Sequence, residues 1–183
     1  MRKKVIVPLA EGFEEIEALS IVDVLRRANV DVTMAAVTSL HVKGAHGIVV
    51  VADALLKTLD SHDYDMIALP GGLPGAINLA EDATTQALLK AFDSKGKPIA
   101  AICAAPYALK IAGVLKDHYT CYPSFEVKID HAGYTGDKKI VEDQNIITSQ
   151  GPSTAMIFAL KLVEILVSHE KARELEKDLL LTH

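Results

Sequence analysis

One stretch of the chain decides its fold: Ile99-Ala100-Ala101-Ile102-Cys103-Ala104-Ala105-Pro106-Tyr107. The apolar run that opens it follows Lys95-Gly96-Lys97-Pro98 and is typical of a central strand that is buried on both faces. The next residues, Ala105–Ala112, have a helical composition and are followed by Gly113. A strand that runs directly into a helix indicates an open α/β sheet, in which sites form at the carboxyl ends of the strands. Cys103 occupies that position.

A thiol at this corner faces the positive end of a helix dipole, which favours thiolate over thiol. The arrangement is that of a nucleophile elbow with cysteine in place of serine. We therefore expect the pKa of Cys103 to lie several units below the reference of about 8.5, and Cys103 to react well before the second cysteine, Cys121. The alternative is that Cys103 packs as a small apolar residue, as most free cysteines do.

Residues 14–28 have helical periodicity, with an apolar stripe at positions 18, 21, 22, 24, 25 and 28. Glu17 heads that stripe and is expected to point toward the sheet, whereas Glu14 and Glu15 favour the helix N-terminus electrostatically. A carboxyl group on a buried face is either paired or neutral, so its pKa should rise. A protonated Glu17 that donates a hydrogen bond to the Cys103 thiolate would satisfy both groups. The alternative is that Glu17 lies at the edge of the stripe and reaches solvent.

A glycine-rich turn, Leu69-Pro70-Gly71-Gly72-Leu73-Pro74-Gly75, follows another buried-strand pattern. Glycines let backbone N–H groups approach a ligand closely, and such groups could serve as oxyanion donors beside a nucleophile on a neighbouring strand. The turn lacks the Gly-Lys-Ser/Thr ending of a phosphate loop. It could also be a turn with no further role.

Strands and helices alternate along the rest of the chain, which indicates a single domain over residues 1–183. The predicted helices are Glu14–Ala28, Asp82–Ser94, Ala105–Ala112, Thr154–Val167 and a surface helix His169–Leu180. The predicted strands are Lys4–Pro8, Asp31–Val37, Ile48–Val51, Met66–Leu69, Ile99–Ile102 and Ile146–Thr148. Tyrosine, threonine, valine and glycine-rich turns predict a β-ribbon over Thr120–Val141.

Composition excludes several classes of function. The 183 residues are 50% hydrophobic and carry a net charge of −5 without a dense basic tract, which disfavours nucleic acid as a main partner. The apolar runs are too short for a membrane span or a signal peptide, and two cysteines without a C-x-x-C spacing suit a reducing cytoplasm. The seven histidines show no metal-ligand spacing, so no metal or other cofactor is expected. His46 is expected to be solvated, or to face the pocket of a partner subunit.

Four segments, in the right order, resemble the ThiJ/PfpI superfamily and specifically its DJ-one branch: Leu9-Ala10-Glu11-Gly12-Phe13-Glu14-Glu15-Ile16-Glu17, Leu69-Pro70-Gly71-Gly72, Ala100-Ala101-Ile102-Cys103-Ala104-Ala105-Pro106 and Thr148-Ser149-Gln150-Gly151-Pro152. The resemblance implies a flavodoxin-like three-layer sandwich with a mostly parallel central sheet. It implies Cys103 as the reactive residue and Glu17 as its protonated partner.

The same resemblance assigns further residues to the site. The backbone amides of Gly72 and Ala104 would form an anion pocket, with Gly71 beside it, and Arg27 matches a basic residue near the pocket at the family's dimer interface. A homodimer is therefore expected. Two positions depart from relatives: Ala104 replaces the histidine of the peptidase-like branch, and Tyr122, before Pro123, replaces a pocket histidine. We expect Tyr122 and Pro123 to contact substrate, and a Cys-His peptidase is disfavoured.

A thiolate beside a protonated acid and an anion pocket suits addition to small electrophilic carbonyls. The resemblance implies a glyoxalase that does not use glutathione, or a deglycase for methylglyoxal and glyoxal adducts on proteins and nucleotides, protecting against carbonyl and oxidative stress. The alternative is a redox sensor or redox-regulated chaperone in which Cys103 oxidises. Both interpretations use the same residues, so the sequence does not separate them.

Overall fold

A computed structural model describes residues 2–181. Its centre is a seven-stranded sheet with the strand order β5-β2-β1-β6-β7-β9-β8. Every neighbouring pair is parallel except β8 and β9. The strands are β1 (Lys4–Leu9), β2 (Asp31–Ala36), β5 (Ala54–Leu55), β6 (Met66–Leu69), β7 (Ile99–Ile102), β8 (Ile140–Asp143) and β9 (Ile146–Ser149). The predicted α/β class with a mostly parallel central sheet is confirmed.

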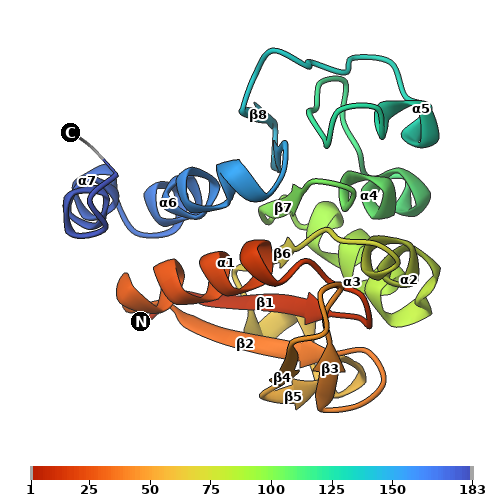
Figure 1. The fold of residues 1–183 in the computed structure, drawn as a ribbon, viewed down its shortest axis with the longest axis horizontal. Helices are drawn as coiled ribbons and strands as arrows, with labels where there is room; N and C mark the ends of the chain where they lie inside the picture. Colours follow the sequence, from red (N-terminus) through yellow and green to blue (C-terminus); the bar gives the residue numbers. More distant parts are fainter. Residues whose placement is uncertain (1, 182–183) are drawn as a thin grey trace.

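Helices cover both faces of this sheet, which gives three layers (Figure 1). One face packs against α1 (Glu15–Arg27) and α6 (Ala155–Leu166), and α7 (His169–Asp178) packs on α6. The other face packs against α2 (Gly75–Glu81), α3 (Ala83–Ser94) and α4 (Pro106–Ala112). Side chains alternate between the two faces along β1: Val5 and Val7 belong to the first apolar cluster and Ile6 to the second. The strands are buried on both sides because helices flank them, as the continuous apolar runs predict.

The predicted elements match the observed ones closely where the pattern is periodic. Strands β6 and β7 have the predicted bounds, and the five predicted helices begin and end within two residues of the observed ones. The predicted strand at 48–51 belongs elsewhere: β4 (Val49–Val51) pairs antiparallel with β3 (His41–Lys43) in a separate hairpin. The edge of the central sheet is formed instead by β5.

The predicted β-ribbon over Thr120–Val141 is wrong. The segment contains the short helix α5 (Glu126–Ile129), and the only strand at its end is β8, which pairs with β9. The residues with high strand propensity are used for packing, because Tyr119, Cys121 and Ile129 form a small third apolar cluster. Tyr119 and Tyr134 share only an isolated bridge, and Asp130 ends α5 with a positive φ of 48°.

Three short 3-10 helices complete the described chain: Leu56–Thr58, Ser61–Asp63 and Pro152–Thr154. Within residues 2–181, every helix is too short or too polar to cross a lipid bilayer.

Candidate active site

Cys103 lies in the sharp turn between β7 and α4, as the elbow prediction requires. Its φ of 64° is in the left-handed region, which costs a residue with a side chain about 1–2 kcal/mol. Two backbone hydrogen bonds hold the turn: the Cys103 N–H donates to the carbonyl of Ser149 (3.0 Å), and the Cys103 carbonyl accepts from the N–H of Tyr122 (2.9 Å). The conformation is therefore imposed by the neighbouring segments, and it presents the side chain at the end of the sheet.

Glu17 reaches the same point from α1. Its side chain is fully buried, and its Oε2 atom accepts a hydrogen bond of 2.7 Å from the N–H of Gly71. The carboxyl group also contacts the thiol of Cys103. Within the described residues, Oε1 is buried and has no hydrogen-bond partner. Because Oε2 acts as an acceptor, a proton on Glu17 belongs on Oε1, where it can be donated to the sulfur. The predicted burial of Glu17 is confirmed.

Gly71 allows this close approach. A Cβ atom at residue 71 would lie 2.6 Å from the Cβ of Cys103 and 2.8 Å from Oε2 of Glu17. Both distances are too short for carbon and oxygen neighbours, so the position accepts only glycine without displacing the pair. Gly71 therefore allows the side chains of Cys103 and Glu17 to meet.

Burial raises the pKa of Glu17 from 4.5 to about 7. The N–H of Gly71 and the Cys103 side chain oppose this rise, and the charge of Glu14 adds to it. Glu17 is therefore close to half protonated at neutral pH, which is the range in which a carboxyl group can both give and take protons.

The predicted low pKa of the Cys103 thiol is wrong. Burial raises the pKa of Cys103, and the negative charge of an ionised Glu17 raises it further, against the backbone N–H groups of Gly72 and Ala104, which lower it. The two side chains are coupled and titrate as a pair. The pair loses its first proton with a pKa of about 7. Loss of the second proton would leave a thiolate and a carboxylate, two negative charges, side by side. Placing the remaining proton on Glu17 produces a thiolate that faces two N–H donors.

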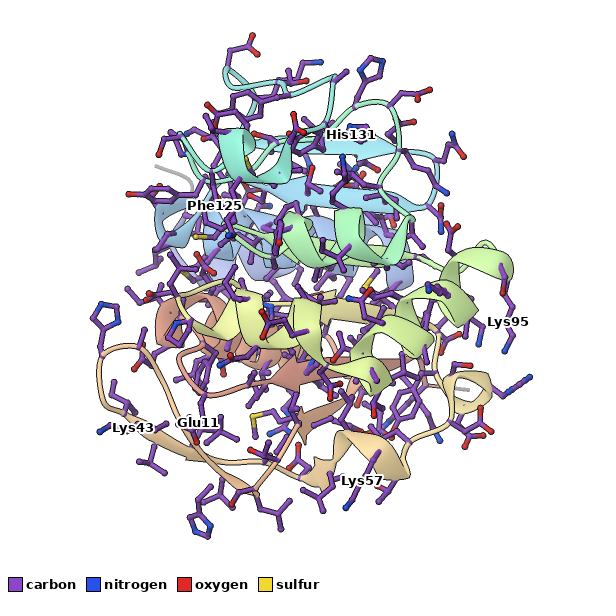
Figure 2. All side chains as sticks on the ribbon, turned by 90° about the vertical axis from the view of Figure 1, so that its right-hand side faces the viewer. Glu11, Lys43, Lys57, Lys95, Phe125 and His131 are labelled. Atoms are coloured by element: carbon purple, nitrogen blue, oxygen red, sulfur yellow. The ribbon has the colours of Figure 1, made fainter. Side chains whose placement is uncertain are left out.

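A pocket of about 590 Å³ opens over Cys103. Helix α1 contributes Ile16, Glu14 comes directly before this helix, and the turn between β3 and β4 contributes Ala45 and His46. The turn after β6 contributes Gly72 and Leu73, and Pro152 follows β9. Tyr122 and Phe125 come from the segment between β7 and β8. Figure 2 shows Phe125 on the side of the molecule that carries Glu11 and Lys43, higher in the view.

The structure brings most of the predicted site residues together, but not all of them. Gly72, Ala104 and Tyr122 line the pocket with Cys103. Pro123 is exposed and lies outside the lining, where Pro152 stands instead. Arg27 is ten residues beyond Glu17 on α1, about 15 Å away along the helix, and pairs with Asp23 at 2.8 Å. Within one chain, Arg27 therefore does not reach the pocket.

Sequence reasoning missed the contribution of His46 and Glu14 to the pocket. The His46 ring is largely exposed, but its Nδ1 atom lies 2.9 Å from Glu15 and 3.5 Å from Glu14 of its own chain. Contact with Glu15 raises the pKa of His46. Although burial opposes it, hydrogen bonds from His46 and Ile48 hold the pKa of Glu15 below its usual value. No spacing rule indicates this cluster, because its members lie about 30 residues apart on different elements.

The same three side chains are the group in the described part of the chain whose ligand atoms could surround a metal ion. One atom from each of Glu14, Glu15 and His46 lies within 4.8 Å of the others. However, the His46 ring nitrogen and the Glu15 carboxylate already satisfy each other. A cation would have to replace that ion pair.

These features define a class: an α/β sandwich with a cysteine at the carboxyl end of a central strand and a buried glutamate beside it. Residues 3–165 match the DJ-1/PfpI family, and the chain belongs to this family. Drosophila melanogaster protein dj-1beta is 40% identical over 186 residues, which cover 100% of both chains. The crystal structure of Drosophila melanogaster DJ-1beta superposes with a TM-score of 0.96 over 100% of both chains, at 40% identity.

Two further relatives bear on size and activity. The chain is 41% identical over 182 residues to Protein DJ-1 homolog B of Arabidopsis thaliana, and these residues are 98% of this chain but 42% of that protein. It is 40% identical over 172 residues to the protein named glutathione-independent glyoxalase DJR-1.2 of Caenorhabditis elegans, covering 93% of this chain and 92% of the relative. The predicted flavodoxin-like fold and family resemblance are thus confirmed.

Proposed function

We propose that the protein is a cysteine-dependent glyoxalase that converts methylglyoxal, glyoxal and related α-oxoaldehydes into 2-hydroxy acids without glutathione. The observation that carries the proposal is the contact between the Cys103 thiol and the buried Glu17 carboxyl group, whose pKa is raised to about 7. The name of the Caenorhabditis elegans relative supports the reaction type. The site needs no further base, because one carboxyl group near neutrality can give a proton and take one back.

The reaction begins when the Cys103 thiolate attacks the aldehyde carbon and forms a C–S bond. Glu17 gives its proton to the new oxyanion, which yields a hemithioacetal. Glu17, now a carboxylate, takes the proton from the former aldehyde carbon and delivers it to the neighbouring carbonyl carbon, while the hydroxyl proton moves to the neighbouring oxygen. The result is a thioester of the 2-hydroxy acid, which solvent water hydrolyses to free acid and thiol. The N–H groups of Gly72 and Ala104 would stabilise the negative charge.

The test is lactate formation from methylglyoxal by the wild type, Cys103→Ser and Cys121→Ser, measured side by side. We expect turnover by the wild type and Cys121→Ser, and its loss in Cys103→Ser. Lactate formation that survives in Cys103→Ser, or that is missing from the wild type, would reject the proposal.

A redox-sensing role is the second candidate, and one observation favours it. The pocket gives access to Cys103, while Gly72, Ala104 and a protonated Glu17 supply donors that could hold a sulfinate. A solved relative, Toxoplasma gondii DJ-1, 41% identical with a TM-score of 0.91 over 97% of this chain and 98% of that chain, is described as oxidized. Mass spectrometry after a peroxide titration tests the role. A redox-sensing role requires Cys103 to gain two oxygen atoms before any methionine is oxidised.

Deglycation of protein and nucleotide adducts, a role in stress protection and a cytoplasmic location remain proposals of the same kind. A redox-regulated chaperone activity would be recognised by suppression of client aggregation that persists in Cys103→Ala.

We also propose a homodimer. Ile16, Leu19 and Ile48 are each at least 40% exposed and lie together where α1 meets the β3–β4 hairpin. An apolar surface of this kind is typical of an interface. Light scattering should give about twice the chain mass of 19.7 kDa, and a monomer at micromolar concentration would contradict the dimer.

A further inference from the structure

The pocket over Cys103 is much larger than a three-carbon substrate needs. Its volume of about 590 Å³ lies within the range of roughly 300–1,000 Å³ that holds drug-sized ligands. Methylglyoxal has only five non-hydrogen atoms, so it would fill a small part of the space beside the thiol. The unfilled part is the candidate subsite for a larger substituent on the substrate.

Apolar side chains surround that space. Leu73 is 53% exposed and Tyr122 50%, although both line the pocket. Their exposure is consistent with surfaces that a substituent would cover. The lining residues include no lysine or arginine of this chain, the one basic side chain among them, His46, is paired with Glu15, and Glu14 supplies a buried carboxyl group. A neutral, apolar substituent therefore suits the subsite better than a carboxylate or phosphate.

The two aromatic rings of the lining are held in place. The Tyr122 N–H donates to the carbonyl of Cys103, so the backbone of Tyr122 is fixed next to Cys103. The Tyr122 ring lies against Gly151, where an added Cβ would be 3.2 Å from ring atom Cδ2. Phe125 makes an edge contact with Tyr107 at a centroid distance of 6.3 Å, and its N–H donates to the Tyr122 carbonyl. Fixed rings of this kind favour flat apolar partners.

We propose that the preferred substrates are aryl α-oxoaldehydes, whose ring lies against Tyr122 and Phe125 while Cys103 attacks the aldehyde carbon. The inference rests on the proposed glyoxalase function and names its substrate class. With phenylglyoxal, the thiolate forms the C–S bond, the hydrogen on the aldehyde carbon moves to the ketone carbon, and water releases the thioester as mandelate. The atoms balance as one phenylglyoxal plus one water for each mandelate.

The first experiment compares kcat/KM for phenylglyoxal and methylglyoxal in the wild type, Tyr122→Ala, Phe125→Ala and Tyr122→Phe. We expect each alanine variant to lower the value for phenylglyoxal about tenfold more than the value for methylglyoxal, from lost ring contacts. Tyr122→Phe keeps the ring and should keep the ratio of the two values. Ile111→Ala, which removes an exposed apolar side chain of α4 outside the pocket, is the matched control and should change neither. Equal losses with both aldehydes would overturn the aryl subsite.

The second experiment separates this inference from the glyoxalase proposal, because it needs no turnover. The rate of Cys103 alkylation by phenacyl bromide is divided by the rate with bromoacetone, since in both the thiolate displaces bromide and only the ring differs. We expect this ratio to fall about tenfold in Tyr122→Ala and to stay unchanged in Ile111→Ala. An unchanged ratio in Tyr122→Ala overturns the subsite. A ring-dependent ratio without turnover of either aldehyde supports the subsite and rejects the glyoxalase.

Discussion

Cys103 and Cys121 are both buried, and neither forms a disulfide. Tyr122, the residue after Cys121, donates its backbone N–H to the carbonyl of Cys103. Burial raises the pKa of each thiol, that of Cys121 to about 12. Cys121 packs with Tyr119 and Ile129, and its thiol contacts the carbonyl of Tyr122 at 3.4 Å. Cys103 has a pocket above it and a buried glutamate that can take its proton. The comparison shows that a partner for proton exchange and access to a ligand distinguish Cys103 from Cys121, whereas burial does not.

The largest expected effect tests the proton partner of Cys103. Glu17→Gln keeps an uncharged group of the same size but cannot relay protons, so we expect methylglyoxal turnover to fall by about 10² to 10⁴. The measurement is the initial rate of lactate formation at pH 7. The matched control is Glu126→Gln, the same substitution at the glutamate near Cys121, and it should leave turnover unchanged. A full rate in Glu17→Gln would remove the proton relay.

The second effect concerns thiol labelling. Iodoacetamide at pH 7 should modify Cys103 on the order of a hundredfold faster than Cys121, since Cys121 is fully buried and stays protonated. The Cys103 rate should rise with pH around a midpoint near 7, where the pair with Glu17 loses its first proton. In Glu17→Gln the midpoint should move up, because the thiol loses the carboxyl group that takes its proton and burial, opposed by the N–H groups of Gly72 and Ala104, then sets the pKa of Cys103. Peptide mapping that finds both cysteines labelled equally in folded protein would contradict the comparison.

The third effect is a pH-dependent stability carried by Glu17. Because folding raises the pKa of Glu17 from 4.5 to about 7, the folded protein binds the proton more tightly than the unfolded chain. This contribution is complete below pH 4.5 and is lost as pH rises through about 7; the shift corresponds to about 3 kcal/mol. Urea unfolding should show Glu17→Gln gaining up to that amount over the wild type between pH 5 and pH 8. The exposed Glu81→Gln should follow the wild type at both pH values.

The smallest effect tests the backbone strain at the elbow. Glycine normally makes a protein less stable than alanine by about 0.5–1 kcal/mol, but the left-handed φ of Cys103 reverses that preference. Cys103→Gly should therefore be about 0.5–1 kcal/mol more stable than Cys103→Ala in urea unfolding. Cys121 is absent from the positive-φ residues, so Cys121→Gly should be the less stable member of its pair. The same order at both cysteines would show that the elbow is unstrained.

The sequence predicts the sheet and the pairing of Cys103 with Glu17 because both follow from local patterns. Strand β7 is an apolar run after a turn, and Glu17 lies on the apolar stripe of a long helix. The segment 120–141 could not be predicted in this way. Tyr119 and Tyr134 pack with Cys121 and Ile129, and Gly133 lies against the backbone of Asp117. Tertiary packing there overrides strand propensity.

The residues that line the pocket also divide into those that local sequence patterns predict and those that tertiary packing brings in. Glu14 is next to residues singled out by periodicity, but its neighbour His46 arrives on a hairpin whose position is set by contacts with Glu15. Phe125 arrives from the mispredicted segment. The raised pKa of Cys103 could not be predicted from the sequence either. It depends on how deeply Cys103 and Glu17 are buried rather than on the order of residues.

The two donors that face the Cys103 sulfur are main-chain atoms, and this affects how the site can vary. Replacing Ala104 by serine or glycine keeps its N–H in place, so a survey of substitutions would score the position as tolerant of small residues. Only proline removes that donor. Gly72 is different: its φ is 92°, and a Cβ there would lie 2.3 Å from the backbone nitrogen of Glu14. Of two positions with the same role, mutational intolerance would therefore reveal Gly72 and hide Ala104.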